Sequence, residues 1–166
     1  MNPNPTDREQ LLQKVRNTPK QVFWSVYLSL LLGVLLAGRA IVLQVTAGTY
    51  SGKSLLFTAL TVGFFAFNGL GLLSRNKLSY VLLAVFALLP APGSLVGAVQ
   101  LLALLATGEF ATRASDTIVS IFGLLQLLVI AGLFVSLLST TTRVYVWPTA
   151  AQGGAAQQAP AEKDTE

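Results

Sequence analysis

Few residues in this chain have side chains that could do chemistry. The 166 residues include no cysteine and no histidine, which removes thiolate chemistry and the commonest metal ligand and general base. Glu109 and Asp116 are the only acidic residues away from the two ends of the chain. Without a second polar cluster, this pair suits the N-terminal end of a helix better than acid–base catalysis. We therefore expect no enzyme activity, no cofactor and no bound metal ion.

One segment has the pattern of a phosphate-binding loop. Residues 47–54 read AGTYSGKS, in which Ala47 takes the place of the first glycine of a relaxed form of that motif. A working phosphate loop joins a strand to a helix in an α/β sheet, and the magnesium ion of its nucleotide needs further acidic ligands. Here the next segment is strongly apolar, and the next acidic residue along the chain, Glu109, follows two apolar segments. We interpret residues 47–54 as a turn with a lysine anchor.

The better candidates are polar residues inside apolar stretches. Such groups are costly in hydrocarbon and often mark a functional position. No Asp, Glu or His is among them, which disfavours proton-coupled transport. The polar residues of this kind are Arg39, Gln44, Asn68, Gln100 and Gln126.

Four long apolar segments must position these residues. A membrane-spanning helix needs about 20 mostly apolar residues, and a soluble domain has no place for four such segments. With 53% hydrophobic and 11% charged residues, the chain has material for one compact bundle and no sizeable soluble domain. We predict an all-α integral membrane four-helix bundle over 22–147. Its spans are expected near 22–45, 55–73, 78–106 and 117–138.

Charge placement predicts the orientation of the bundle. With a cytoplasmic N-terminus, eight basic residues fall on the inner side and three on the outer side, which is a positive-inside bias. The charges lie in short flanks beside apolar segments, so we expect the lipid bilayer, and no nucleic acid, as a partner. We predict a multi-pass protein of the bacterial cytoplasmic (inner) membrane, N-in and C-in. The inner residues are Arg8, Lys14, Arg16, Lys20, Arg75, Lys77, Arg143 and Lys163, and the outer ones are Arg39, Lys53 and Arg113.

The two ends of the chain are expected to be cytoplasmic appendages. Within the lead-in 1–21, residues 6–18 have the pattern of an amphipathic helix, with Thr6 and Glu9 as a capping box. The alternative is a frayed segment. Residues 148–166 are rich in Ala, Gln and Gly and have too little apolar surface to fold, so we expect a disordered tail.

The third apolar segment is too long for an upright helix. Residues 78–106 would form a helix of about 43 Å, whereas the hydrocarbon core is about 30 Å thick. Pro90, Pro92 and Gly93 interrupt it, and Gly97 completes a GxxxG pattern for close helix packing. We favour one span kinked at Pro90–Gly93. The alternative is a re-entrant hairpin, which would place Arg143 and the C-terminal tail on the outer side and weaken the charge bias.

Further packing and polar contacts follow from this layout. Ala59 and Gly63, four apart in the second span, predict a face that another helix can approach closely. Gln100 and Gln126 are expected at similar depths, where an interhelical hydrogen bond can form. We hypothesise that both join Arg39 and Gln44 in an outer polar cluster that holds spans one, three and four together. The alternative is that each side chain is satisfied independently.

Two short signatures carry a family resemblance. Arg75 and Asn76 precede the third span, and Arg143 with Tyr145 and Trp147 closes the fourth. From the second span onward, this layout resembles small, largely uncharacterised four-helix bacterial inner-membrane proteins, which have a Gly-Arg-Asn-Trp turn before the third helix. The chain departs from that turn at Ser74 and Lys77. The resemblance implies the four-helix fold and no activity.

These observations predict a non-catalytic protein that acts through helix packing and partner contact. It would be an accessory subunit, an assembly factor or an immunity-type protein, bound to another membrane protein or to itself. The alternative is a small transporter or channel component that uses the broken third helix, because irregular backbone at membrane depth lines pathways in such proteins. A membrane enzyme is a third class, and it is disfavoured.

Overall fold

The chain is helical throughout the part that the computed structural model describes, which is residues 18–49, 51–108 and 114–148. Those residues form six helices and no strand, which confirms the all-α prediction. The amphipathic pattern before Thr18, residue Glu109 and the tail after Pro148 lie outside the described residues. The helices are α2 (Lys20–Thr46), α3 (Gly52–Leu73), α4 (Lys77–Phe86), α5 (Ala91–Thr107), α6 (Ala114–Leu138) and α7 (Thr140–Val146).

Three of these helices have the length and composition of membrane spans. They are α2, α3 and α6, and α4 with α5 would make a fourth if the pair is one span. A turn at residues 87–90 separates α4 from α5, and the two helices are bent by 40° at this break. The chain is therefore consistent with a multi-pass membrane protein.

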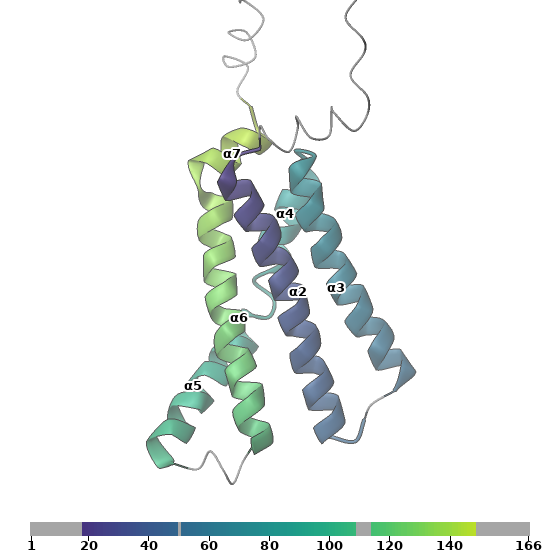
Figure 1. Ribbon diagram of the computed structural model, residues 1–166, viewed down its shortest axis with the longest axis vertical. Coiled ribbons are helices and arrows are strands. Elements are labelled where there is room, and N and C mark those ends of the chain that lie inside the picture. Colours follow the sequence, from purple (N-terminus) through teal and green to yellow (C-terminus); the bar gives the residue numbers. More distant parts are fainter. Residues whose placement is uncertain (1–17, 50, 109–113, 149–166) are drawn as a thin grey trace, which may run out of the picture.

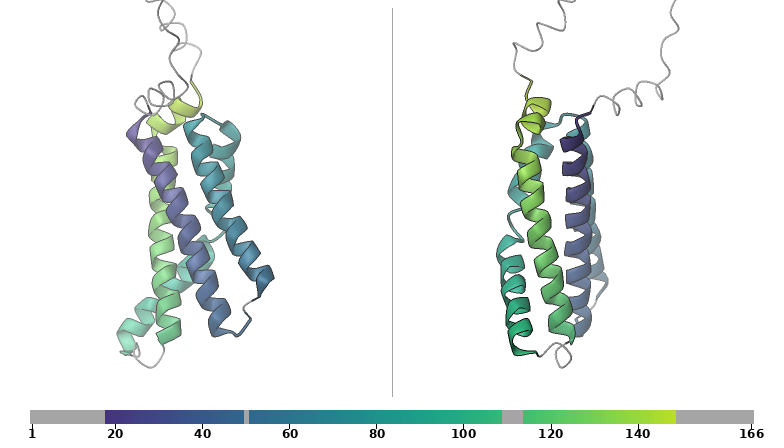
Figure 2. Two further views of the ribbon diagram at one scale, coloured as in Figure 1. Left: turned by 45° about the vertical axis from the view of Figure 1, so that its right-hand side comes forward. Right: turned by 60° about the vertical axis from the view of Figure 1, so that its left-hand side comes forward.

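The long helices lie side by side along the molecule (Figure 1). Helix α2 packs between α3 and α6, and α6 packs against α5 on its other side. The start of α2, the end of α6 and the short helix α7 lie at one end, which we call the α7 end, and α5 finishes at the opposite end (Figures 1 and 2). Helix α4 fills the α7 end between α3 and α6.

Side-chain caps define where several helices begin. Ser51 and Ser54 form a capping box at the start of α3. The phosphate-loop-like segment thus connects two helices rather than a strand and a helix. The Asn76 side chain accepts the Leu78 backbone N–H at 3.0 Å at the start of α4. Asp116 lies in the first turn of α6, where its charge complements the helix dipole.

The break between α4 and α5 is a turn with its own backbone hydrogen bonds. Pro90 and Pro92 have no N–H to donate, so the α-helical ladder cannot continue through them. The turn instead has hydrogen bonds between residues three apart in the sequence, from Leu88 N to Val85 O at 3.2 Å and from Ala91 N to Leu88 O at 3.0 Å. Backbone groups left unpaired in a bilayer would cost several kcal/mol, so these bonds lower the cost that such a break would have at membrane depth.

Small residues set the distances between helices. A Cβ added to Gly69 of α3 would collide with the Ser29 side chain of α2. A Cβ added to Gly97 of α5 would lie 3.0 Å from the Gly123 Cα of α6. In a bilayer the hydrophobic effect does not drive helices together, because lipid tails are as apolar as the helix surfaces. Close approach of the backbones instead stabilises the helix pair through van der Waals packing. The large side chains that are fully buried include Leu32, Leu72, Leu83, Leu133 and Leu137.

The expected packing face on the second span is not used within the chain. Ala59 and Gly63 are both exposed, and a Cβ added to Gly63 would meet nothing within 4 Å. In contrast, Gly33 on α2 is buried and its added Cβ would lie 3.1 Å from the Phe65 Cβ of α3. Helix α3 therefore packs on α2 through one face and leaves the Gly63 face open.

Candidate functional site

The candidate site is a polar cluster around Arg39, in the half of α2 that is farther from the α7 end. The Arg39 guanidinium reaches two other helices: Nη1 donates to Gln126 Oε1 of α6 at 3.1 Å, and Nη2 donates to the Gly93 carbonyl of α5 at 2.9 Å. Arg39 is only partly exposed, and its Nε is buried without a hydrogen-bond partner in the structure. One side chain thus ties α2 to both α5 and α6.

Gln126 is the centre of this cluster and is fully buried. Its Nε2 donates to the Leu35 carbonyl at 3.0 Å, which adds a second tie between α6 and α2. The hydroxyl of Ser94, also fully buried, lies 3.1 Å from Gln126 Oε1 and 2.9 Å from the Pro90 carbonyl. A hydroxyl has one hydrogen, so Ser94 donates to one of these acceptors at a time. We call Arg39, Gln126, Ser94 and the Leu35 and Gly93 carbonyls the Arg39–Gln126 cluster.

Two glycines make this arrangement possible. A Cβ added to Gly123 would lie 2.8 Å from the Gly97 Cα and 3.2 Å from the Ser94 carbonyl oxygen. A Cβ added to Gly97 would also lie 3.6 Å from Arg39 Nη2. The absence of both side chains lets α5 approach α6 closely enough for Ser94 to reach Gln126. The Gly97 position predicted for helix packing therefore faces Gly123, and Gly93 of the same pattern faces Arg39.

The remaining predicted residues lie apart from this cluster. Gln100 is exposed and lines a hollow of about 480 Å³ at the far end of α2, α5 and α6, which Thr46 and Asp116 also line. Between the described residues Gln100 and Gln126 the structure has no hydrogen bond, because Gln126 uses its amide on α2 and α5. Gln44 is partly buried, and its Oε1 has no partner in the structure.

The proline pair and the other polar span residue also have defined places. Pro90 immediately precedes α5 and its carbonyl accepts the Ser94 N–H, whereas Pro92 is exposed in the first turn. Asn68 is buried and donates to the Phe64 carbonyl of its own helix at 2.9 Å. Asn68 is therefore satisfied locally rather than by a neighbouring helix.

Sequence reasoning did not single out Ser94 or Gly123. A serine hydroxyl in a helix can donate to the carbonyl four residues earlier, so a serine in an apolar helix needs no partner on another helix. The sequence around Ser94 therefore does not indicate an interhelical contact. Gly123 lies three residues before Gln126, one turn away on the same face of α6. A small residue one turn from a buried amide is the signal that would have pointed to this contact.

A second set of polar contacts closes the α7 end. The Tyr80 hydroxyl of α4 donates to the Leu137 carbonyl of α6 at 2.9 Å. The Tyr145 hydroxyl of α7 donates to the Leu73 carbonyl of α3 at 2.9 Å, and the Arg75 guanidinium lies 4.7 Å from the centre of the Tyr145 ring. The Tyr145 bond fastens α7 to α3, and the Tyr80 bond ties α4 to α6 at the same end.

The chemistry of the Arg39–Gln126 cluster is that of a tie between helices. Its acceptors are amide and hydroxyl oxygens and backbone carbonyls, and an arginine stays protonated, so none of these groups can exchange protons as an acid–base pair. Asp116 is the only acidic residue among those described, and it lies outside the cluster. The described residues also contain no group of three His, Cys, Asp or Glu side chains that could hold a metal ion.

Comparison of the chain with family models, curated proteins and solved structures found no match.

Proposed function

We propose that this chain is a non-catalytic membrane protein that acts by packing its helices against a partner. It would serve as an accessory subunit, an assembly factor or an immunity-type protein of the bacterial inner membrane. In this proposal α4 and α5 form one kinked span of a four-helix bundle, and both ends of the chain are cytoplasmic. The partner is another membrane protein or a second copy of the chain.

The observation that carries this proposal is the open face of α3. Five exposed residues follow each other at intervals of three or four along that helix, which places them on one face. Gly63 lies in the middle of the stripe with open space around it, although Gly33, Gly97 and Gly123 each meet a neighbouring helix. Small residues at an interface let membrane helices approach closely, and Gly63 supplies one on this face. The stripe consists of Leu56, Leu60, Gly63, Phe67 and Leu70.

Purification of the full chain from its own membranes in a mild detergent would test this proposal. We expect a complex of fixed stoichiometry by native mass spectrometry, either with a second protein or with another copy. Gly63→Leu should abolish that complex, since the added side chain occupies the space of the incoming helix. Ala131→Leu, which introduces the same side chain at an exposed position of α6 and adds one carbon fewer, should leave it intact. A strictly monomeric chain, or equal loss in both variants, would contradict the proposal.

A second candidate function is a component of a small transporter or channel. The observation that favours it is the break before α5, because Arg39 holds the Gly93 carbonyl beside non-helical backbone. Substrate and ion sites in transporters form at such interrupted helices. Flux through liposomes that contain the purified chain, lost in Arg39→Met, would favour this candidate, and no flux above empty liposomes would exclude it for the chain acting alone.

A further inference from the structure

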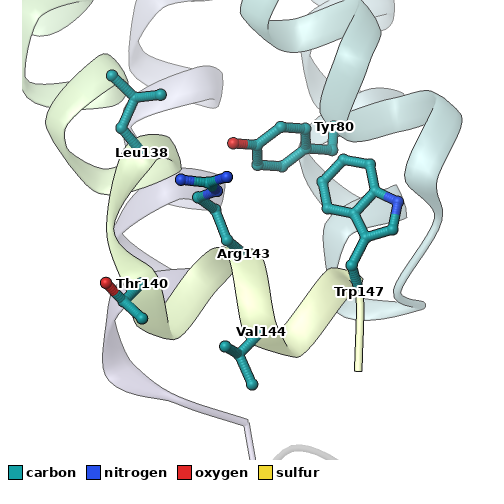
Figure 3. Close-up of a pocket in the computed structure, with 6 residues that line it drawn as sticks. All are labelled: Tyr80, Leu138, Thr140, Arg143, Val144 and Trp147. Carbon is teal, nitrogen blue, oxygen red and sulfur yellow. The ribbon is translucent and has the colours of Figure 1, made fainter. Parts of the chain in front are cut away.

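A hollow of about 610 Å³ opens at the α7 end of the molecule. Tyr80 comes from α4, Leu138 is the last residue of α6, three residues come from α7, and Trp147 directly follows that helix (Figure 3). Helix α7 turns across the end of α6 at this place (Figure 1). Its lining residues are Tyr80, Leu138, Thr140, Arg143, Val144 and Trp147.

Its aromatic wall is already fixed by contacts within the chain. The rings of Tyr80 and Trp147 pack edge to face with their centres 4.7 Å apart. The Tyr80 hydroxyl donates to the Leu137 carbonyl, so it is not free to bind a ligand. Tryptophan and tyrosine collect at the level of lipid headgroups, because they combine an apolar ring with a polar group. The hollow therefore has the composition of a membrane–water boundary.

Arg143 supplies an unfilled set of hydrogen-bond donors to the hollow. Figure 3 shows its guanidinium directed from α7 toward Leu138 and Tyr80. It makes no hydrogen bond or ion pair with another described residue, in contrast to Arg75, which lies over the Tyr145 ring. A guanidinium presents five N–H donors in a planar fork that matches the oxygens of a phosphate group.

The charge at this end favours an anionic ligand. Lys20 begins α2, Lys77 begins α4, and Arg75 and Arg143 lie at the same end of the described chain. The only acidic residue described, Asp116, lies in the first turn of α6 at the opposite end. Basic pockets between membrane helices bind anionic lipid headgroups. The described part of the chain provides no carboxylate here that would compete for Arg143.

An apolar surface continues from the hollow along α6. Leu138, which lines the hollow, is 62% exposed, and Val135, one turn further along the same face, is 74% exposed. A phospholipid whose headgroup occupied the hollow could lay an acyl chain against these residues. A free phosphate ion would leave that surface unused.

We propose that this hollow binds the headgroup of an anionic phospholipid, independently of any partner on α3. The Arg143 guanidinium donates to the phosphate oxygens, and Thr140 offers a hydroxyl beside them. The Tyr80–Trp147 pair forms the wall of the site. The face of α6 at Leu138 and Val135 receives an acyl chain.

Trp147 provides the readout, because the chain has two tryptophans and the other, Trp24, is exposed and lies outside the hollow. The full-length Trp24→Phe chain in a neutral detergent would be titrated with short-chain phosphatidylglycerol or phosphatidylcholine while Trp147 fluorescence is recorded. We expect saturable binding with at least about tenfold preference for phosphatidylglycerol, since a headgroup with net negative charge is favoured at a basic site. Arg143→Gln should weaken phosphatidylglycerol binding about fiftyfold, because the charge and its hydrogen bonds are both lost.

Matched controls separate this site from general attraction to the basic end. Lys77→Gln removes the same charge at that end outside the hollow and should weaken binding no more than about fivefold. Thr140→Phe keeps Arg143 but fills the hollow, and it should abolish the preference for phosphatidylglycerol over phosphatidylcholine. Equal effects of Arg143→Gln and Lys77→Gln, or equal binding of the two lipids, would overturn the proposal. A fluorescence response to inorganic phosphate that matches the lipid response would overturn the assignment to a lipid.

Discussion

The Arg39 guanidinium of α2 donates a hydrogen bond of 3.1 Å to Gln126 Oε1 of α6. A charged side chain inside a bilayer costs up to roughly 2.5–3.5 kcal/mol on insertion scales, and less toward the interface. Arg39 offsets part of this cost by donating to Gln126 and to the Gly93 carbonyl. The same bonds fix α2, α5 and α6 relative to one another next to the break. The hydrogen bonds that offset the cost of burying Arg39 therefore also specify how these helices are arranged.

Gln126→Leu should destabilise the chain more than Gln100→Leu. The first substitution removes the Gln126 hydrogen bonds to the Leu35 carbonyl and to Arg39 Nη1 in a buried place, whereas Gln100 is exposed and makes no hydrogen bond to another described residue. We expect a loss of about 2 kcal/mol in unfolding free energy for Gln126→Leu and less than about 0.5 kcal/mol for Gln100→Leu. Reversible unfolding in mixed micelles, followed by circular dichroism, would measure both values. Equal losses would show that the cluster contributes no specific stability.

A methyl group should have opposite effects at Gly97 and Gly63. Gly97→Ala forces apart the α5 and α6 backbones, because its Cβ would lie 3.0 Å from the Gly123 Cα, and we expect a loss of about 1–3 kcal/mol. Gly63→Ala has open space and should gain up to about 1 kcal/mol from its higher helix propensity. The same unfolding measurement on the monomeric chain would compare them. If Gly97→Ala is as stable as Gly63→Ala, the close approach of α5 and α6 is not a constraint.

The sequence predicted the helices well because their signal is local. The first and fourth spans, expected near 22–45 and 117–138, correspond to helices at Lys20–Thr46 and Ala114–Leu138. The long third segment corresponds to α4 and α5 on either side of the turn at residues 87–90, where proline removes backbone donors. Length, hydropathy and proline positions are properties of single segments, so they can be read without knowing which helices are neighbours.

The contacts within the Arg39–Gln126 cluster depend on how each helix is rotated about its axis. The depth of a residue along its span does not determine this rotation. Similar depths of Gln100 and Gln126 allow an interhelical hydrogen bond. In the structure, Gln126 is buried and bonds Arg39, whereas Gln100 is exposed. The Gly93 carbonyl could not be recognised in advance, since every residue has a carbonyl. Which one accepts a bond from Arg39 depends on the close approach of the helices at Gly97 and Gly123.

Removal of the Tyr145 hydroxyl should loosen α7. Tyr145→Phe keeps the ring beneath Arg75 but loses the hydrogen bond to the Leu73 carbonyl, at a cost of about 1 kcal/mol. Tyr27→Phe removes a hydroxyl from an exposed side chain and should cost less than about 0.3 kcal/mol. Hydrogen exchange of the α7 amides would show faster exchange in Tyr145→Phe alone. Unchanged exchange would mean that the ring contact with Arg75 is sufficient to hold α7.

Cysteine labelling should place the two ends of the α4–α5 pair on opposite sides of the membrane. The chain has no cysteine, so Lys77→Cys and Thr107→Cys each introduce one thiol for a membrane-impermeant maleimide. The bend of 40° leaves both helices running in broadly the same direction, and together they are longer than the hydrocarbon core of about 30 Å. We expect Lys77→Cys to react from the same side as Lys20→Cys, and Thr107→Cys from the same side as Thr46→Cys. Reaction of Lys77→Cys and Thr107→Cys from one side would instead identify a re-entrant hairpin, and the proposed four-span topology would be wrong.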